Sequence, residues 1–259
     1  MSSKQKQYIL FFFLIIILFS INYKTLDSFV VGFLDESEKI KIQRVIDGDT
    51  IKANNKSIRL LGINSPEKGE PYFNEAKEFL EKLILNKTIK LESTKQDLYG
   101  RTLAYLFLKN ENVNLAIVKN GFANPYFPEG KQKYYSEFQN SWKKCTEDNL
   151  NICKKSKDKC AECVTLKNFD YKNQKIIFYN KCSFDCDLTD WQIKDEGRKK
   201  FIFPEFILSS EKSVEILVEE GTNTRDKLFW DRKTYVWTKS GDTLFLRDEN
   251  YGLILFKNY

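Results

Sequence analysis

Hydrophobic and polar residues alternate in short runs along the N-terminal half of the chain, a pattern typical of half-buried β-strands. The alternating runs lie at 40–46, 50–52, 57–61, 88–93 and 101–108. Between the second and third runs stands Asn54-Asn55, a pair that tolerates the left-handed backbone of a tight turn. The first three runs therefore predict a three-stranded meander, and the last two predict two further strands.

Apolar residues at helical spacing separate these strands. Asn74 is expected to cap a first helix. Its inner face would carry Ala76, Phe79, Leu80 and Leu83. Asn112 opens a second helix over 113–120, which Gly121 ends, and a third is expected over about 131–144. Five strands with about three helices predict a mainly β domain, a closed barrel of the oligonucleotide-binding (OB) type, although pattern alone does not choose the topology.

The C-terminal half carries a different pattern, without helical periodicity. The polar, charged stretch 154–162 marks a domain boundary. Strand-like runs follow it at 164–169, 175–179, 191–195, 200–203, 213–217, 227–230, 235–237, 243–247 and 253–256. This spacing is typical of an immunoglobulin-like β-sandwich. We therefore expect a barrel domain over 39–155, a linker over 156–162 and a sandwich over 163–259.

An apolar, uncharged segment at residues 8–21 follows Lys4 and Lys6. Fourteen helical residues span about 21 Å, short of the roughly 30 Å hydrocarbon layer, which favours a signal peptide over a comfortable membrane span. No small-x-small cleavage site follows, so an uncleaved anchor stays open. We expect a signal peptide or signal anchor over 1–24, a linker over 25–38, and domains that lie outside the cytoplasm, secreted or membrane-anchored.

Six cysteines, all in the C-terminal half, fit an exported protein. They are Cys145, Cys153, Cys160, Cys163, Cys182 and Cys186. An even number of cysteines outside the cytoplasm is expected to form disulfides. The competing interpretation is a zinc site, because the last four have ribbon-like spacing and four thiolates bind zinc tetrahedrally.

The composition narrows the chemistry, because the chain contains no histidine. This excludes Ser-His-Asp and Cys-His nucleophile systems, histidine metal sites and histidine acid–base pairs. Acid–base chemistry must therefore use carboxylates, lysine, tyrosine or metal-bound water. The 42 basic against 36 acidic residues, net charge +6, favour anionic partners only weakly, since ordinary surfaces carry similar excesses.

Three short motifs carry candidate chemistry in one order along the chain. They read VIDGDT at 45–50, IRLLGINSPE at 58–67 and LYGRTLAY at 98–105. Each alone has an ordinary structural explanation: a hairpin turn, an exposed strand residue or a helix start. Together and in this order they closely resemble the staphylococcal nuclease (thermonuclease) family, over about 39–155. The resemblance implies an OB-fold barrel that cleaves DNA and RNA with Ca²⁺ and leaves 3′-phosphate products.

The resemblance also implies a metal site. Asp49 corresponds to a direct calcium ligand, Asp47 to a carboxylate that supports the ion through water, and Ser65 to a ligand through its backbone carbonyl. Asn64 falls at a second ligand position, where the family usually has aspartate. An amide oxygen binds calcium without adding charge, so we expect a weak site and a high calcium requirement.

The same resemblance implies a phosphate site. Arg59 and Arg101 correspond to the phosphate-binding pair, Glu67 to the proposed general base and Tyr99 to the nucleotide-site tyrosine. Phosphodiester hydrolysis builds charge on the non-bridging oxygens, and the planar arginine fork meets two of them at once. A carboxylate base is consistent with a chain that lacks histidine. Tyr126 lies in a segment that could stack nucleobases, or simply pack.

The C-terminal half resembles a second family. DLTDWQIKD at 187–195, FIFP at 201–204 and GDTLFL at 241–246 resemble a lamin-tail domain, an immunoglobulin-like sandwich, over about 163–259. Trp191 is expected in its core. In this fold at least one of Cys160 and Cys163 should bridge to Cys182 or Cys186. No catalytic constellation is visible here, and such modules are thought to bind a partner or surface.

The leading hypothesis is therefore an exported, calcium-dependent nuclease that acts on DNA and RNA, and we expect it to be a monomer. The alternative is a catalytically weak or inactive cell-surface protein that binds nucleic acid, favoured if Asn64 abolishes metal binding. Chelator-sensitive degradation of plasmid supports the first, and metal-independent retardation without degradation supports the second. A purely structural adhesin would require the two arginines and Asp49 to coincide by chance.

Overall fold

The computed structural model describes residues 4–5, 7–9, 11–14 and 38–259. It divides into two units, Met1–Glu38 and Lys39–Tyr259. The described residues before position 15 are helical, and Glu38 begins the first strand. No helix within the described ranges is long and apolar enough to cross a membrane. Most of the expected signal segment 1–24 and nearly all of the linker 25–38 lie outside the described residues, so both stay predictions.

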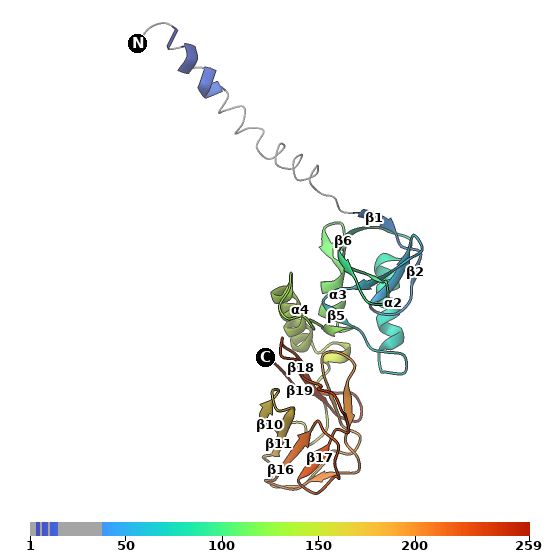
Figure 1. Ribbon diagram of the computed structural model, residues 1–259, viewed down its shortest axis with the longest axis vertical. Coiled ribbons are helices and arrows are strands. Elements are labelled where there is room, and N and C mark those ends of the chain that lie inside the picture. Colours follow the sequence, from blue (N-terminus) through green and yellow to red (C-terminus); the bar gives the residue numbers. More distant parts are fainter. Residues whose placement is uncertain (1–3, 6, 10, 15–37) are drawn as a thin grey trace. The chain divides into compact units, whose positions relative to one another are not determined.

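The first half of the second unit is a mainly antiparallel sheet, drawn in blue and green in Figure 1. Its described strands are β1 (Glu38–Lys41), β2 (Arg44–Val45), β3 (Thr50–Ala53), β4 (Lys56–Leu60), β6 (Thr88–Gln96), β7 (Thr102–Leu108) and β8 (Glu111–Asn112). They pair in the order β1-β6-β7-β4-β3-β2, with β8 on β7. The expected Asn54-Asn55 turn joins β3 to β4, with φ of 48° and 60°. A separate short pair joins β5 (Ile63–Asn64) to β9 (Asn124–Pro125).

The mainly β class is confirmed, but the closed ladder that we expected does not form among the described strands. The path is open, and its two ends, β1 and β2, follow one another in the chain. Between them, Ile42 exchanges backbone hydrogen bonds with Asn86 and Lys87, whereas Gln43 donates to Lys52 of β3. One bent segment thus spans both ends of the sheet, where the alternating pattern suggested a single strand.

Three helices follow the expected order within the described residues. α2 (Phe73–Ile84) begins after Tyr72 in the left-handed conformation, so Asn74 is not its cap. α3 (Val113–Lys119) begins as expected, because the Asn112 side chain accepts a hydrogen bond from the Leu115 amide. α4 (Tyr135–Asp148) starts and ends four residues later than expected, after another left-handed residue, and a 3₁₀ turn, η1 (Asn151–Cys153), follows it.

The second half is built of short strands in two four-stranded sheets and one two-stranded sheet among the described residues. The strands are β10 (Val164–Asp170), β11 (Lys175–Asn180), β12 (Cys186–Asp187), β13 (Gln192–Lys194), β14 (Lys200–Ile202), β15 (Ile207–Leu208), β16 (Ser213–Leu217), β17 (Lys227–Phe229), β18 (Thr243–Arg247) and β19 (Leu253–Asn258). The orders are β10-β11-β16-β17 and β14-β13-β18-β19, with β12 on β15. Trp191 is buried in the core between them, as expected.

Two details of the sandwich differ from the sequence pattern. Residues 235–237 are not a strand: Val236 and Trp237 are buried, and their amides donate to the side chain of Gln174. The buried Val236 and Trp237 follow the exposed Tyr235, and this apolar run resembled a short strand in the sequence. The pair β12–β15 was missed because two-residue strands carry no measurable period.

Three disulfides use all six cysteines, so no cysteine remains for a zinc site. Cys145 pairs with Cys153 and joins the end of α4 to η1. Cys160 pairs with Cys186, and Cys163 with Cys182, inside the sandwich. Both of the latter fulfil the expectation that Cys160 or Cys163 would bridge to Cys182 or Cys186.

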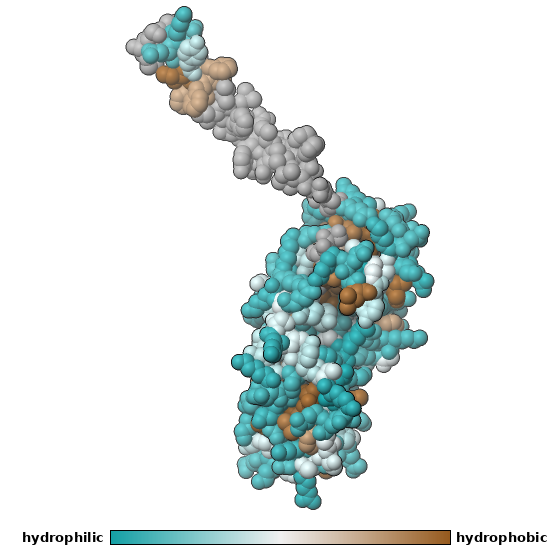
Figure 2. Space-filling view, in the orientation of Figure 1, coloured by the Kyte–Doolittle hydropathy of each residue, from teal (hydrophilic) through white to brown (hydrophobic). Residues whose placement is uncertain are grey.

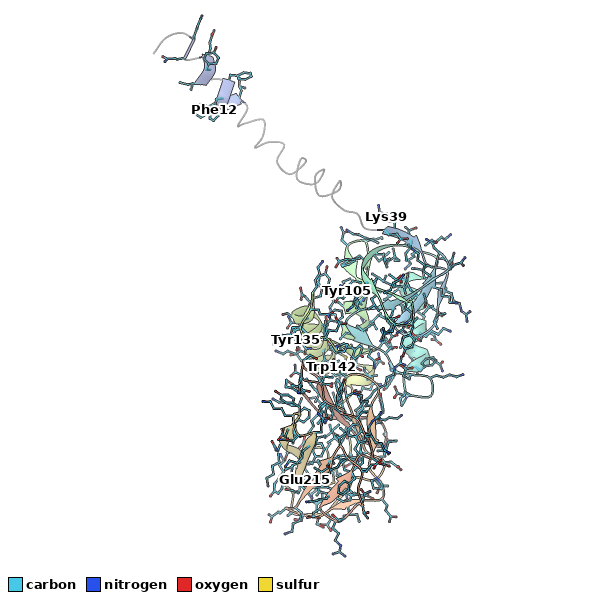
Figure 3. The ribbon with its side chains drawn as sticks, viewed as in Figure 1. Phe12, Lys39, Tyr105, Tyr135, Trp142 and Glu215 are labelled. Carbon is cyan, nitrogen blue, oxygen red and sulfur yellow. A yellow bond between two sulfur atoms is a disulfide. The ribbon has the colours of Figure 1, made fainter. Side chains whose placement is uncertain are left out.

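Residues 39–155 are here called the barrel, although their ladder is open. The sandwich packs directly onto this barrel through a shared apolar cluster. Phe245, Tyr251 and Leu253 of the sandwich belong to the same buried cluster as the barrel core. Trp142 of α4, labelled in Figure 3, contacts Phe245 edge-on at 5.4 Å between ring centroids. The outer face, by contrast, is mostly hydrophilic with small separate hydrophobic patches (Figure 2). The two halves of the second unit are therefore one packed body and not two independent modules.

Candidate active site

Asp47 and Asp49 stand in the turn that leads from β2 into β3. The Asp47 carboxylate accepts a hydrogen bond from the Asp49 amide at 3.0 Å, which shapes the turn. A Cβ on Gly48 would lie 2.7 Å from the Cβ of Ser65 and 2.8 Å from that of Ala76. Only glycine lets the turn approach β5 and α2 this closely, so the motif's central glycine places Asp49 beside Ser65.

The Asp49 carboxylate ties three strands together and is almost fully buried. Its Oδ2 accepts hydrogen bonds from the Ser65 amide at 2.8 Å and hydroxyl at 3.0 Å, and its Oδ1 accepts from Thr50. Arg59, on β4, brings its Nη2 within 3.1 Å of the same Oδ2. That Nη2 also donates to Asn64 Oδ1 at 3.4 Å. Asp47, Asp49, Asn64 and Ser65 therefore form one group, here called the oxygen cluster, with Arg59 at its edge.

The oxygen cluster holds two carboxylates, and Arg59 contacts one of them, Asp49. Burial, and then the charge of Asp49, raises the pKa of the Asp47 carboxyl to about 6. Arg59 Nη2 contacts both the Asp49 carboxylate and the Asn64 amide oxygen, so a cationic group already lies where these two oxygens converge. Oxygen donors of this kind are what Ca²⁺ prefers. The residues therefore fit a calcium ion, although no group of three or more His, Cys, Asp or Glu within the described residues gathers at one point.

Arg101 lies at the end of a loop organised by Asp97. The Asp97 carboxylate pairs with Arg101 Nε at 2.7 Å and accepts from the amides of Arg101 and Tyr99. Burial opposes it, but these hydrogen bonds lower the pKa of Asp97. The guanidinium stands over the Tyr99 ring, 5.5 Å from its centroid. Sequence reasoning missed Asp97, although its spacing of four residues from Arg101 was a usable signal.

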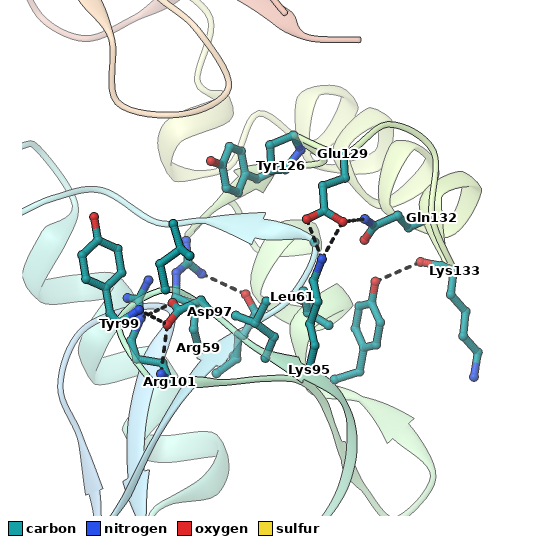
Figure 4. Close-up of a pocket in the computed structure, with 16 residues that line it drawn as sticks. Arg59, Leu61, Lys95, Asp97, Tyr99, Arg101, Tyr126, Glu129, Gln132 and Lys133 are labelled. Carbon is teal, nitrogen blue, oxygen red and sulfur yellow. Dashed lines mark hydrogen bonds and ion pairs between the residues drawn. The ribbon is translucent and has the colours of Figure 1, made fainter. Parts of the chain in front are cut away.

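Arg59, Arg101, Tyr99 and Tyr126 line one cavity of about 670 Å³, here called the arginine pocket (Figure 4). Lys95 and Lys133 also line the wall, where Lys95 pairs with Glu129 and Lys133 with Glu92. Tyr99 is 85% exposed, so its ring is available for stacking. The pocket therefore offers cations to a phosphate and aromatic faces to bases.

Glu67 does not line the arginine pocket. Its carboxylate pairs instead with Arg198 Nε of the sandwich at 2.6 Å. Asn64 is also turned toward the sandwich, because its Nδ2 donates to the Gly197 carbonyl at 2.8 Å. The sequence-predicted residues thus form two groups that Arg59 links, with Glu67 beside them on the sandwich side. Nothing in the local sequence pointed to Gly197 or Arg198, since both lie more than a hundred residues away.

Comparison with known proteins identifies two regions of the chain. Residues 57–155 match the family model described as staphylococcal nuclease homologue, and residues 157–256 match the Lamin Tail Domain model. A thermonuclease from Staphylococcus intermedius is 34% identical over 127 residues, which cover 44% of this chain and 76% of that protein. A thermonuclease from Staphylococcus hyicus is 35% identical over 124 residues, 43% of this chain and 73% of its own. Endonuclease YncB of Bacillus subtilis (strain 168) is 32% identical over 131 residues, 45% of this chain and 62% of its own.

Proposed function

We propose, from the premise that this chain belongs to the staphylococcal nuclease homologue family and hydrolyses phosphodiester bonds in nucleic acid, that it is an exported calcium-dependent endonuclease for DNA and RNA. The observation that carries the proposal is the position of Arg59. It lines the arginine pocket and also contacts Asp49 and Asn64 in the oxygen cluster. One residue therefore joins a phosphate site to a site for a hard cation.

In this proposal Arg59 and Arg101 bind the scissile phosphate. Each guanidinium is held by a carboxylate, Asp49 for Arg59 and Asp97 for Arg101. Such pairing orients the planar forks before substrate arrives, and a positioned arginine stabilises the charge that develops on the non-bridging oxygens. Tyr99 and Tyr126 contribute faces on which bases stack.

Calcium would be held by Asp49, Asn64 and the backbone carbonyl of Ser65, with Asp47 supporting it through water. When bound, the ion would add positive charge beside the phosphate and lower the pKa of water. Asp47 is suited to this role because its carboxylate accepts a hydrogen bond from the Asp49 amide and so lies beside that ligand. Only one fully charged ligand contacts the ion directly, so we expect weak binding, in the range of roughly 10⁻⁴–10⁻³ M that extracellular sites tolerate.

Glu67 is proposed as the general base: it accepts the proton of the attacking water as the P–O5′ bond breaks, and the leaving 5′-oxygen takes up a proton from solvent water and departs as a hydroxyl. The phosphate would then remain on the 3′-oxygen, giving 3′-phosphate ends. The carboxylate is 40% exposed, so water reaches it. Its ion pair with Arg198 keeps it in place beside the oxygen cluster and is taken up again below.

Export is supported by the three disulfides, since such bonds persist in oxidising compartments. We therefore propose that the domains are secreted or held outside the cytoplasm by residues 8–21, and that the protein acts as a monomer. The sandwich is available to bind a surface or partner through the faces that it does not use against the barrel.

The test is digestion of plasmid DNA, single-stranded DNA and RNA with and without calcium. We expect cleavage of all three, loss of cleavage in the presence of a chelator, and products that a 3′-phosphatase, but not a 5′-phosphatase, dephosphorylates. Retardation of nucleic acid without cleavage at millimolar calcium would instead support the inactive nucleic-acid-binding protein. Cleavage that persists in the chelator would refute the calcium requirement alone.

A further inference from the structure

A hairpin of the sandwich lies against the segment that carries Asn64 and Glu67. The hairpin consists of β13, β14 and the loop 195–199 between them, here called the site loop. The segment 64–72 runs from the end of β5 to the start of α2 and contains no helix or strand beyond Asn64. Ordering each residue of such a segment costs about 1–2 kcal/mol of backbone entropy. Something outside the segment must therefore help to hold it.

Four contacts join the hairpin to this segment. Gly197 accepts a hydrogen bond from Asn64, and Arg198 pairs with Glu67. Lys194 Nζ lies 3.2 Å from Glu70 Oε2, and Lys200 Nζ lies 3.7 Å from Glu70 Oε1. The contacting residues of the segment are Asn64, Glu67 and Glu70, each three positions after the last. The contacts with the hairpin therefore extend along the segment.

Glu70 connects the hairpin to the backbone of Glu67. Its Oε2 accepts a hydrogen bond from the Glu67 amide at 2.9 Å and pairs with Lys194 as well. The side chains of Lys194 and Glu70 are only 7% and 12% exposed, so water screens this pair little. Burial acts against it, but the charge of Lys194 holds the pKa of Glu70 below its usual value. The hairpin thus fixes Glu67 through its backbone and through its carboxylate.

The hairpin itself is held in place by packing elsewhere. Arg247 of β18, next to β13 in the sheet, is fully buried and donates to the Ile152 carbonyl of the barrel at 2.6 Å. Trp142 contacts both Phe245 and Phe256. The site loop also accepts from the Asn124 side chain through the Glu196 carbonyl at 2.9 Å. Because the site loop is anchored on this packed interface, it is a fixed part of the site.

We infer that the sandwich is a positioning element of the nuclease site: its hairpin clamps segment 64–72, and Arg198 and Lys194 are positioning residues that hold Glu67 beside the oxygen cluster. The catalytic part of this inference rests on the role proposed above for Glu67. Pre-organising a reacting group lowers the barrier because its ordering cost is met during folding. The inference assigns the C-terminal half a task in catalysis beyond binding a partner.

The test compares Arg198→Ala with Arg225→Ala, a matched control at an exposed arginine of the same sandwich. Misplacing a reacting group by about 1 Å can cost about 10²-fold, so we expect kcat on a single-stranded DNA oligonucleotide to fall by about 10-fold to 100-fold in Arg198→Ala. KM should stay within about twofold, because the arginine pocket is untouched. Arg198→Lys should recover part of kcat by restoring the charge. Hydrogen–deuterium exchange of the full chain should show faster exchange over 65–72 in Arg198→Ala alone.

An unchanged kcat with unchanged exchange would overturn the inference, and so would a rise in kcat, which would mean that the site loop obstructs the site. A wild-type protein that fails to cleave would refute the proposed function and the catalytic part of the inference. Even then the exchange measurement would decide whether the hairpin clamps the segment, because it needs no substrate. The two failures are therefore distinguishable.

Discussion

The arginine pocket and the oxygen cluster share Arg59, yet the chain builds them in different ways. The pocket is assembled entirely by barrel residues, and its second arginine is held by Asp97, four residues away in the same loop. On the other side of the site, Asn64 of the oxygen cluster and Glu67 contact the sandwich, at Gly197 and Arg198 respectively. One side of the site is therefore local and the other depends on the contact between the two halves. Substitutions on the two sides should separate catalytic rate from stability of the docked sandwich.

The largest expected effect is on the local side. Arg101→Lys keeps a positive charge but loses the planar fork that meets two phosphate oxygens. Removal of one pre-organised donor typically lowers kcat by about 10²–10³. The thermal midpoint should hardly change, because lysine keeps the charge beside Asp97 and residues 98–100 of the loop are exposed. Arg44→Lys, at an exposed arginine of β2, is the control, and activity of Arg101→Lys within a few-fold of wild type would remove Arg101 from the site.

The next effect should appear on the interdomain side as a loss of stability. Glu70→Gln removes the ion-pair partner of Lys194, whose ammonium is buried. Breaking a buried pair in this way costs about 3 kcal/mol. Urea unfolding measures the change in the free energy of unfolding, with Glu78→Gln on the exposed face of α2 as the control. A loss as small as that of the control would mean that the Lys194–Glu70 pair does not hold the hairpin.

Stability should also depend on pH through three carboxyls at the interface. Burial, and then the charge of Asp242, raises the pKa of Asp195 to about 7 and that of Glu196 to about 8, and burial raises the pKa of Asp242 as well. Lys194 and Lys199 offset this only in part at Asp195. A pKa raised by folding means that the native state holds protons that the unfolded chain has released. The bound protons therefore stabilise the native state fully below about pH 4, near the pKa of the carboxyls in the unfolded chain. This stabilisation is lost as the pH rises from there through the folded values of about 7 and 8.

The expected difference between pH 6 and pH 7 is about 2 kcal/mol, or roughly 4–8 °C in thermal midpoint for a domain of this size. Differential scanning calorimetry at the two pH values provides the measurement. Glu196→Gln should remove much of the difference, whereas Glu219→Gln, at an exposed position, should leave it. A midpoint that rises with pH over this range would contradict the assignment.

The smallest effect should come from Asn64→Asp, which tests both sides at once. An aspartate cannot donate to the Gly197 carbonyl, and the lost hydrogen bond costs about 1 kcal/mol of stability in the absence of calcium. The added charge should lower the calcium concentration needed for half-maximal activity. Asn140→Asp, exposed on α4, is the control. An unchanged calcium optimum would remove Asn64 from the coordination shell.

Much of the barrel followed from local pattern. The Asn54-Asn55 turn, the Asn112 cap and most strands of both halves depend on interactions within a few residues, and these were predicted correctly. The starts of α2 and α4 were not, because both follow a tyrosine in a left-handed conformation that tertiary packing imposes against propensity. The open ladder was missed for a similar reason: the bend at Ile42 depends on Asn86 and Lys87.

What the sequence by itself determined is the set of chemical groups and most of their local geometry. The absence of histidine, the Asp47-Gly48-Asp49 turn and the Tyr99–Arg101 loop are properties of composition and of short spacing. Only the tertiary structure decided that a hairpin from the other half holds Asn64 and Glu67. That contact spans more than a hundred residues and arises from packing around Trp142 and Phe245. Its partners carry no shared spacing or motif, because they meet only once both cores have formed.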